Sequence, residues 1–232
     1  MPKLSIVIPV YNEARTVRRL LETVSAVEVK GLTKEIIVVD DGSTDGTREI
    51  LGGLTQLIDR LHLQEKNCGK GAAIRQGFAL CTGDYVIVQD ADLEYDPREY
   101  DHILSPLLDG RADVVYGSRF VGSGPHRVLF FWHYVGNRFL TLLSNMMNNL
   151  NLTDMETCYK AFRRESLELF RQRLTSNRFT IEVELTAMVA KHHLRLYEVG
   201  ISYGGRTYAE GKKINWKDGL SAVWAIIKFN LF

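Results

Sequence analysis

The sequence predicts an α/β protein in which helices flank a mostly parallel sheet. Two segments near the amino terminus, LSIVIPV at residues 4–10 and EIIVVD at residues 35–40, are almost uninterrupted runs of apolar β-formers. Such runs are typical of strands that are buried on both faces of a sheet. The segment between them has apolar residues at helical spacing. A strand, helix, strand alternation favours parallel strands joined by right-handed crossovers.

The other elements of the first half continue this alternation. The first helix is expected to be capped by Asn12 and to bury a face formed by Val17, Leu20, Leu21, Val24 and Val27. A second helix is expected after Ser43 or Thr44, and a third from about Gly71. The pattern then predicts strands at 61–64, 85–90 and 113–117, with a helix over 98–108 before the last of them.

After residue 119 the rhythm changes to longer, aromatic-rich segments. These comprise residues 128–150, a CYKAF run at 158–162, a helix at 181–191, a strand near 194–203 and a terminal helix near 215–230. There is no low-complexity linker and no internal repeat. We therefore interpret residues 1–232 as one domain with a nucleotide-binding front half, 1–120, and a different back half, 121–232.

Composition excludes several other classes of protein. With 232 residues, 45% hydrophobic and 25% charged, the chain fits a soluble globular protein, and a net charge of +1 gives no general attraction to nucleic acid. Three cysteines without a CxxC pair indicate reduced thiols in the cytosol. The first residues lack a signal-peptide pattern, and no window reaches the roughly 18 apolar residues of a spanning helix. We expect a chain that does not cross a bilayer.

The segment VIVQDADLEYDP, residues 86–97, is the strongest chemical signal in the sequence. A strand pattern ends here in Asp90 and Asp92, and Glu94 follows two residues later. Carboxylate oxygens suit Mg²⁺ or Mn²⁺, which hold phosphates and keep several waters. Ligands of open α/β sheets bind outside the carboxyl ends of the strands, where this run ends. The segment therefore indicates a metal site for phosphate-ester chemistry, with a solvated turn as the alternative.

Several familiar phosphate-binding patterns are missing or misplaced. The first strand is followed by Tyr-Asn-Glu and not by the glycines of a dinucleotide-binding GxGxxG motif. GSTDGT at residues 42–47 lacks the lysine of a P-loop. The acidic pair Asp40 and Asp41 follows the second strand, whereas a phospho-receiver carries its pair after the first. Dehydrogenases, P-loop enzymes and receivers are thus disfavoured.

Five motifs in fixed order carry a resemblance to one family. They are PVYNE (9–13), VVDDGSTDGT (38–47), NCGKGAA (67–73), QDADLEYDP (89–97) and GSRF (117–120). Together they resemble the family 2 glycosyltransferases, which have a GT-A fold. DMETCYKAFRR (154–164) and YGGRTYAEGKKINWKDG (203–219) look like the branch of the dolichol-phosphate mannose and dolichol-phosphate glucose synthases. The resemblance runs from residue 4 to about residue 228.

This resemblance implies roles for residues on the donor side. Pro9, Tyr11, Glu13 and Asp40 match positions that face the nucleotide base and ribose, while Asp41, Ser43 and Asp45 have helix capping as the alternative. Lys70, between two glycines and before a helix, is expected to approach a phosphate; a solvated turn is the alternative. Asp90 and Asp92 match the family's Asp-x-Asp, which binds the cation and donor phosphates, and Glu94 is a plausible third oxygen ligand.

Lysine and arginine side chains of the second half are expected to bind the acceptor phosphate beside the donor phosphates. Family match favours Arg119, Arg206 and Lys212, with Arg138 and Lys213 as further candidates. Arginine can bind a phosphate with two parallel hydrogen bonds, and lysine supplies a compact charge. A phosphate acceptor is already an anion and needs no carboxylate base. We expect Asp92, Arg119 and Arg206 to be catalytic, and Lys212 to bind substrate.

The resemblance implies an inverting transferase that moves a hexose, mannose or glucose, from GDP-mannose or UDP-glucose to a polyprenyl phosphate such as a dolichyl or undecaprenyl phosphate. Mg²⁺ or Mn²⁺ is the expected cofactor. The aromatic segment 128–139 and the apolar end 220–232 are candidate interfacial helices for peripheral contact with the cytoplasmic face of a membrane, with core packing as the alternative. Two other functions stay open: transfer to a soluble glycan or polysaccharide, and a catalytically silent nucleotide-binding subunit.

Overall fold

The computed structural model describes residues 1–122, 127–128, 130–207 and 216–231. Their strands form a seven-stranded sheet in the order β3-β2-β1-β4-β6-β5-β7. The strands are β1 (Lys3–Val10), β2 (Thr33–Asp40), β3 (Arg60–Leu63), β4 (Tyr85–Val88), β5 (Val114–Ser118), β6 (Lys160–Arg163) and β7 (Leu196–Gly200). Neighbouring strands are parallel except at β6, which is antiparallel to β4 and to β5. The predicted α/β fold with a mostly parallel sheet is confirmed.

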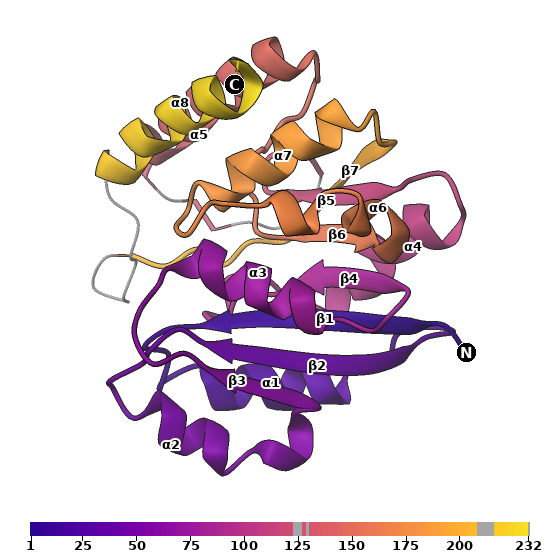
Figure 1. Cartoon of the computed structure of the whole chain (residues 1–232), viewed down its shortest axis with the longest axis vertical. Helices are drawn as coiled ribbons and strands as arrows, with labels where there is room; N and C mark the ends of the chain where they lie inside the picture. The colour runs from indigo at the N-terminus through magenta and orange to yellow at the C-terminus, as the bar shows by residue number, and fades with distance from the viewer. Residues whose placement is uncertain (123–126, 129, 208–215, 232) are drawn as a thin grey trace.

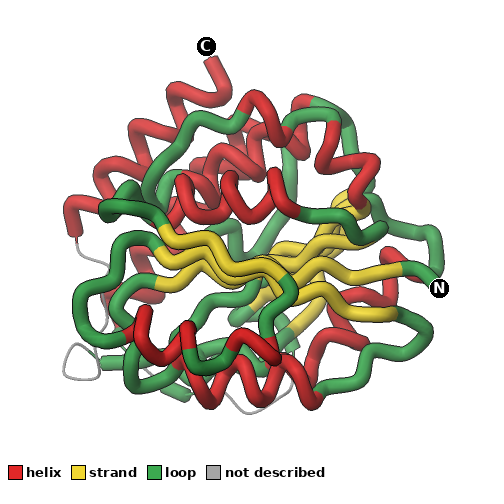
Figure 2. Tube along the Cα trace, turned by 60° about the horizontal axis from the view of Figure 1, so that its bottom comes forward, coloured by secondary structure: helices red, strands yellow, loops and turns green. Residues whose placement is uncertain are grey.

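Helices cover both faces of the sheet (Figure 2). The front half contributes α1 (Val17–Ala26), α2 (Thr47–Gly52), α3 (Lys70–Leu80) and α4 (Tyr100–Leu108), and the back half contributes α5 (Phe131–Asn148), α6 (Arg164–Glu168), α7 (Ile181–Lys191) and α8 (Trp216–Leu231). Short 3-10 turns lie at Thr55–Leu57, Pro97–Glu99 and Arg171–Arg173. In Figure 1, α5 and α8 run together on the outer side of α7.

Alternate side chains of the buried strands pack into hydrophobic cores on the two faces of the sheet. Leu4, Ile6 and Ile8 of β1 belong to the core that includes side chains of α1 and α4, whereas Val7 belongs to the core that includes side chains of α3, α7 and α8. Successive side chains of a strand point to opposite faces, so a strand with helices on both sides is apolar at nearly every position. This is why the first two strands are readable from sequence.

Two local expectations differ from the structure. The sequence does not predict a strand in the 158–162 run, yet most of β6 lies there, and the first residue of this strand, Lys160, is fully buried. Asn12 does not cap α1, which begins at Val17 after Thr16. Asn12 instead adopts a left-handed conformation with φ 51°, and its side-chain oxygen accepts a hydrogen bond from the Thr44 amide at 2.8 Å. Asn12 therefore joins the loop after β1 to the loop after β2.

The strand ends bring distant motifs to one edge of the sheet. Val10 pairs with Asp40 in the β1–β2 register, and β4 ends two residues before Asp90. The loops that follow these three parallel strands consequently lie at the same edge. Among the described residues, no helix has the length and apolar character required to cross a membrane.

Candidate functional site

A cavity of about 880 Å³ lies where these loops meet the helices of the back half. Its walls come from the loops after β1, β2 and β4, from the start of α3, and from α5, α7 and α8. The polar and charged side chains that line it are Tyr11, Glu13, Asp41, Asn67, Lys70, Asp90, Asp92, Glu94, Tyr95, Arg119, His133, Asn137, Glu156, Arg178, Glu182, Tyr203, Arg206 and Asp218. The cavity thus joins both predicted halves of the chain.

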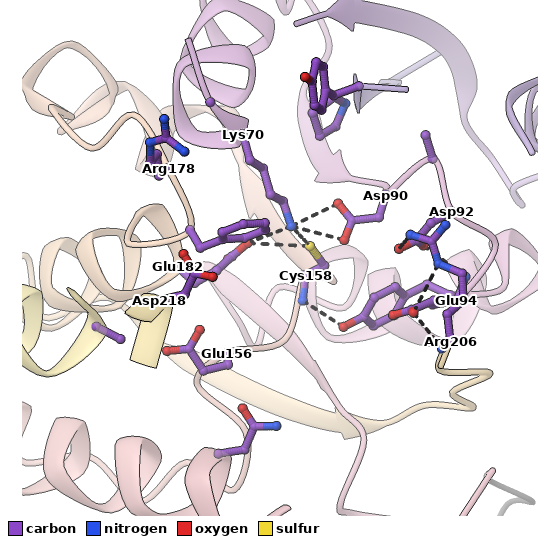
Figure 3. A pocket seen from close by; sticks show the side chains of 18 of the residues that line it. Lys70, Asp90, Asp92, Glu94, Glu156, Cys158, Arg178, Glu182, Arg206 and Asp218 are labelled. Atoms are coloured by element: carbon purple, nitrogen blue, oxygen red, sulfur yellow. Dashed lines mark hydrogen bonds and ion pairs between the residues drawn. The ribbon is translucent and has the colours of Figure 1, made fainter. Parts of the chain in front are cut away.

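Lys70 forms the centre of one charged cluster in the cavity wall (Figure 3). Its Nζ lies 3.0 Å from Oδ1 of Asp90 and 3.3 Å from Oε1 of Glu182, and it contacts Sγ of Cys158. Burial opposes the charge on Lys70, but the neighbouring carboxylates outweigh it and raise the pKa of the lysine well above its usual value. Lys70 is therefore a fixed cation beside Asp90, and not a solvated turn residue.

Close backbone packing presents Lys70 to the cavity. A Cβ atom at Gly69 would lie 2.2 Å from the Asn177 carbonyl oxygen, and one at Gly71 would lie 2.4 Å from that of Ser176. The loop before α7 can thus approach the start of α3 only because both neighbours of Lys70 are glycines. The same loop places Arg178 at the cavity wall.

Arg206 forms a second cluster with three carboxylates. Its guanidinium lies 2.9 Å from Asp92, 3.2 Å from Glu13 and 3.4 Å from Glu94. The backbone amide of Arg206 also donates to Glu94 at 2.8 Å, and the Tyr203 hydroxyl donates to the same carboxylate at 2.7 Å. The loop after β7 therefore closes over the acids that follow β1 and β4.

The acids of the QDADLEYDP segment form a crowded anionic group. Burial, followed by repulsion from Asp90 and Glu94, raises the pKa of Asp92 to about 7, although Arg206 acts in the opposite direction. A dication would relieve this repulsion. Among the described residues, no group of three or more acidic, histidine or cysteine side chains is arranged to hold a metal ion. Magnesium commonly uses one or two carboxylates together with substrate phosphates and waters, so Asp90 and Asp92 fit Mg²⁺ or Mn²⁺ in that mode, and Glu94 stays a predicted third ligand.

Arg119 reaches the cavity from the end of β5 but is held by Asp154. Its Nε and Nη2 donate to the two oxygens of Asp154, each at 2.7 Å, and its backbone amide donates to Oδ2 at 3.0 Å. Its guanidinium also lies 5.2 Å from the Tyr203 ring centroid. These contacts fix the orientation of the arginine.

Pro9, Tyr11 and Glu13 of the PVYNE segment all line the cavity. Asp40 does not. Its side chain is fully buried, with Oδ2 accepting from the amides of Gly42 and Ser43 and from Nε of Arg48 at 2.7 Å. The next residue, Asp41, lines the cavity and accepts from the Cys68 and Gly69 amides at 2.7 and 2.8 Å.

Other predicted residues divide into three groups. Ser43 accepts from the Asn12 amide at 2.9 Å, and Asp45 accepts from the Thr47 amide at the start of α2 at 3.1 Å, so both organise loops. Arg138 lies exposed on α5. Lys212 and Lys213 fall outside the described residues. The structure adds Glu156, Arg178 and Glu182 to the cavity wall, which the sequence did not single out.

The fold and this acid-rich cavity agree with the GT-A fold expected of a glycosyltransferase. Residues 5–170 match the model of the family described as Glycosyl transferase family 2, and the chain belongs to that family.

Named relatives agree with this class. The chain is 34% identical over 171 residues to undecaprenyl-phosphate 4-deoxy-4-formamido-L-arabinose transferase of Yersinia enterocolitica, covering 72% of this chain and 50% of the relative. It is 31% identical over 199 residues to glycosyltransferase AglJ of Haloferax volcanii, covering 85% and 62%. An uncharacterized protein of Methanocaldococcus jannaschii is 27% identical over 233 residues, with 99% and 93% covered. The chain thus spans only part of the two named transferases.

Solved structures of glucosyl-3-phosphoglycerate synthase from Mycobacterium tuberculosis share the fold. One, in complex with phosphoglyceric acid, has a TM-score of 0.74 at 21% identity and covers 100% of this chain and 81% of that chain. Another, in complex with Mn²⁺, uridine diphosphate and glucosyl-3-phosphoglycerate, has a TM-score of 0.72 at 22% identity and covers 99% and 79%. The synthase has also been solved with Mg²⁺ and uridine diphosphate.

Proposed function

We propose that this glycosyltransferase moves a hexose, mannose or glucose, from a nucleotide diphosphate sugar to a polyprenyl phosphate, with inversion at the transferred carbon. The donor class is supported by the family and by the paired carboxylates at the carboxyl edge of the sheet. The lipid acceptor agrees with the printed name of the Yersinia relative, which describes a transferase of undecaprenyl phosphate. We propose on this basis that the protein belongs to the dolichol-phosphate sugar synthase-like branch.

One structural observation carries the proposed acceptor: two helices that line the cavity also expose apolar side chains. Trp132, Gly136 and Leu140 of α5 and Gly219 and Ala222 of α8 line the cavity. We define the apolar stripe of α5 as Phe131, Val135, Phe139, Leu142 and Met146, which are 65%, 37%, 56%, 58% and 73% exposed. On α8, Leu220, Trp224 and Leu231 are each more than 60% exposed.

The spacing of these exposed residues argues for a lipid environment. Members of the apolar stripe of α5 recur every three or four residues and therefore occupy one side of the helix. Helices that present such a side bind the interface of a membrane, where the exposed apolar area is removed from water. A polyprenyl phosphate would then bring its phosphate to the cavity while its chain stays near these helices. We place the protein at the cytoplasmic face of the membrane as a peripheral protein.

The donor diphosphate is assigned to the acidic end of the cavity. Asp90, Asp92 and Glu94 would hold Mg²⁺ or Mn²⁺, which supplies neutralisation of the charge that develops on the leaving nucleoside diphosphate. Lys70 and Arg206 lie beside these acids, and we assign both cations to the donor phosphates. Pro9, Tyr11 and Glu13 are assigned to the nucleotide, and we retain Asp40 as a candidate that would act from behind the cavity wall through Asp41.

The acceptor phosphate is assigned to Arg119 and to Lys212, which lies outside the described residues. Asp154 holds the guanidinium of Arg119 with two parallel hydrogen bonds, which orients the remaining donors of the arginine. An ionised phosphate oxygen can attack the sugar carbon without losing a proton, so no general base is required. Positioning of two anions by fixed cations is then the main contribution of the protein to the reaction.

A labelled-sugar transfer assay tests this proposal. Purified protein with Mg²⁺ or Mn²⁺ is incubated with radiolabelled UDP-glucose or GDP-mannose and with polyprenyl phosphate, a soluble glycan, or no acceptor. We expect label in the organic phase only with polyprenyl phosphate. Label on the glycan would support the soluble-acceptor function, and nucleotide binding without any transfer would support a silent subunit. Either result would refute the proposal.

A further inference from the structure

Glu156 is a cavity residue that the proposed reaction does not yet use. It lies in the connection between α5 and β6 and lines the cavity. Its Oε1 is buried and has no hydrogen-bond partner among the described residues. Buried polar oxygens are nearly always paired, so the unpaired oxygen of a carboxyl group that lines a cavity points to a partner supplied by a ligand.

The backbone around Glu156 is firmly fixed. The Met155 amide donates to Oγ1 of Thr141 at 3.1 Å, and the buried ammonium of Lys160 donates to the carbonyl oxygens of Met155 and Thr157. The preceding residue, Asp154, is held by Arg119. These contacts fix the backbone from which the Glu156 side chain extends, which favours a defined position for a binding group.

Neighbouring cations are already committed to other carboxylates. Nζ of Lys160 lies 2.9 Å from Glu182, and Arg119 is paired with Asp154. Burial, together with repulsion from Glu182, raises the pKa of Glu156 to about 7 despite the opposing charges of Lys160 and Arg119. A ligand that donates hydrogen bonds would stabilise the ionised carboxylate.

The chemistry of the substrates restricts which group could be that donor. An ionised carboxylate only accepts hydrogen bonds, and the oxygens of ionised phosphates also only accept. Of the substrate parts proposed for this cavity, the nucleoside and the transferred sugar carry hydrogen-bond donors, and the nucleoside is assigned to Pro9, Tyr11 and Glu13. In Figure 3, Glu156 lies on the opposite side of Cys158 from Asp92 and Arg206, and Glu182 is one of its charged neighbours. It is thus separated from the acids assigned to the diphosphate.

We propose that Glu156 recognises the transferred sugar, with its carboxylate accepting a hydrogen bond from a hydroxyl group of the hexose. The inference rests on the proposed donor class and is independent of the acceptor. It makes Glu156 a specificity-determining residue, which would favour hexoses that carry a hydroxyl group at the matching carbon. A residue that binds the sugar should contribute to the affinity of the nucleotide sugar and leave that of the nucleoside diphosphate unchanged.

Calorimetric titration with Mg²⁺ tests this distinction. UDP-glucose, UDP-galactose and GDP-mannose are compared with UDP and GDP on the wild type, Glu156→Ala, Glu156→Gln and the surface control Glu165→Ala, whose parent side chain is 77% exposed. The preference is the affinity for a nucleotide sugar divided by the affinity for its nucleoside diphosphate. For one nucleotide sugar, we expect this ratio to fall at least about tenfold in Glu156→Ala, which corresponds to about 1.4 kcal/mol and is within the contribution of a hydrogen bond to a charged group. Glu156→Gln keeps the shape of the side chain, and its preference for the nucleotide sugar should fall several-fold. This variant replaces Glu156→Ala if the alanine variant does not fold.

Three outcomes would overturn the role of Glu156: an unchanged preference in both variants, an equal loss of affinity for nucleoside diphosphates, or a wild type that prefers no sugar in the panel. Failure of the proposed function gives a different result. A wild type that shows the sugar preference, loses it in Glu156→Ala, and yet transfers nothing to polyprenyl phosphate would refute the lipid acceptor and support the sugar-recognition role.

Discussion

Replacing Asp92 with asparagine should stabilise the metal-free protein while removing its response to metal. Asp92 is buried between Asp90 and Glu94, and its pKa is raised from 3.8 to about 7. The folded state therefore binds the Asp92 proton more tightly than the unfolded state does. Stability from this group is greatest below about pH 4, falls as the pH rises through about 7, and is constant above that.

The size of the effect follows from the two pKa values. A difference of about 3 pH units at roughly 1.4 kcal/mol per unit gives a cost of about 4 kcal/mol for the ionised carboxylate. Asparagine avoids this cost but loses the 2.9 Å contact with Arg206, which retains Glu13 and Glu94. We therefore expect a net gain of about 2 kcal/mol at pH 8, or at least about 4 °C in Tm for a chain of this size.

Thermal unfolding at pH 8 and pH 5, in EDTA and with Mg²⁺ or Mn²⁺, measures this prediction. In EDTA, Asp92→Asn should melt above the wild type at pH 8, and the difference should shrink by more than half at pH 5. Metal should raise the Tm of the wild type and not that of the variant. The control Asp109→Asn, whose parent side chain is 50% exposed, should behave as the wild type. A variant that melts below the wild type at pH 8 in EDTA would refute this reasoning.

Four further predictions concern neighbouring features. Arg119→Lys keeps the charge but cannot form both hydrogen bonds to Asp154, and breaking a buried ion pair completely costs roughly 3–5 kcal/mol. The free energy of unfolding, measured with denaturant, should therefore fall by about 2–3 kcal/mol, and a change within about 0.5 kcal/mol would contradict a structural role for these two hydrogen bonds. Gly71→Ala should lower stability by about 1–3 kcal/mol and raise the KM for the nucleotide sugar, because the loop before α7 must move; Gly52→Ala, where a Cβ meets open space, should do neither. Phe139→Ser should weaken sedimentation with anionic vesicles roughly tenfold at unchanged Tm, and equal sedimentation would argue against membrane contact by the apolar stripe of α5. The ratio of the affinity for the nucleotide sugar to that for its nucleoside diphosphate should rise in the wild type between pH 6 and pH 8, as Glu156 with a pKa of about 7 ionises, and this ratio should not change with pH in Glu156→Gln; parallel pH profiles of the ratio would contradict the assignment.

The front half of the fold was readable because its strands are buried on both faces, which leaves nearly continuous apolar runs. The sequence does not predict β6 because this strand is only four residues long and begins with Lys160, whose buried charge is neutralised by an ion pair with Glu182. A lysine inside a strand normally indicates exposure. Only the tertiary pairing of Lys160 with a side chain of α7 makes this strand compatible with burial.

The sequence predicts those site residues that directly follow a recognisable buried strand. PVYNE and QDADLEYDP lie at the cavity because both follow buried parallel strands. The sequence does not show which of the adjacent residues Asp40 and Asp41 faces the cavity. Neighbouring side chains of an extended segment point to opposite sides, and the structure places Asp41 in the cavity wall. The contact of Arg206 with Glu13, 193 residues away, and the unpaired oxygen of Glu156 depend on packing that no local pattern encodes.

Release of nucleoside diphosphate, measured with and without polyprenyl phosphate for the wild type and Asp92→Asn, tests the central claim most directly. UDP-glucose and GDP-mannose are supplied separately, each with Mg²⁺ or Mn²⁺. We expect the wild type to release one of the two nucleoside diphosphates only when the lipid phosphate is present, and the variant to release about a hundredfold less, as when a transition-state contact is removed. Release that ignores the lipid, or that survives in Asp92→Asn, would contradict a metal-assisted transfer to polyprenyl phosphate in this cavity.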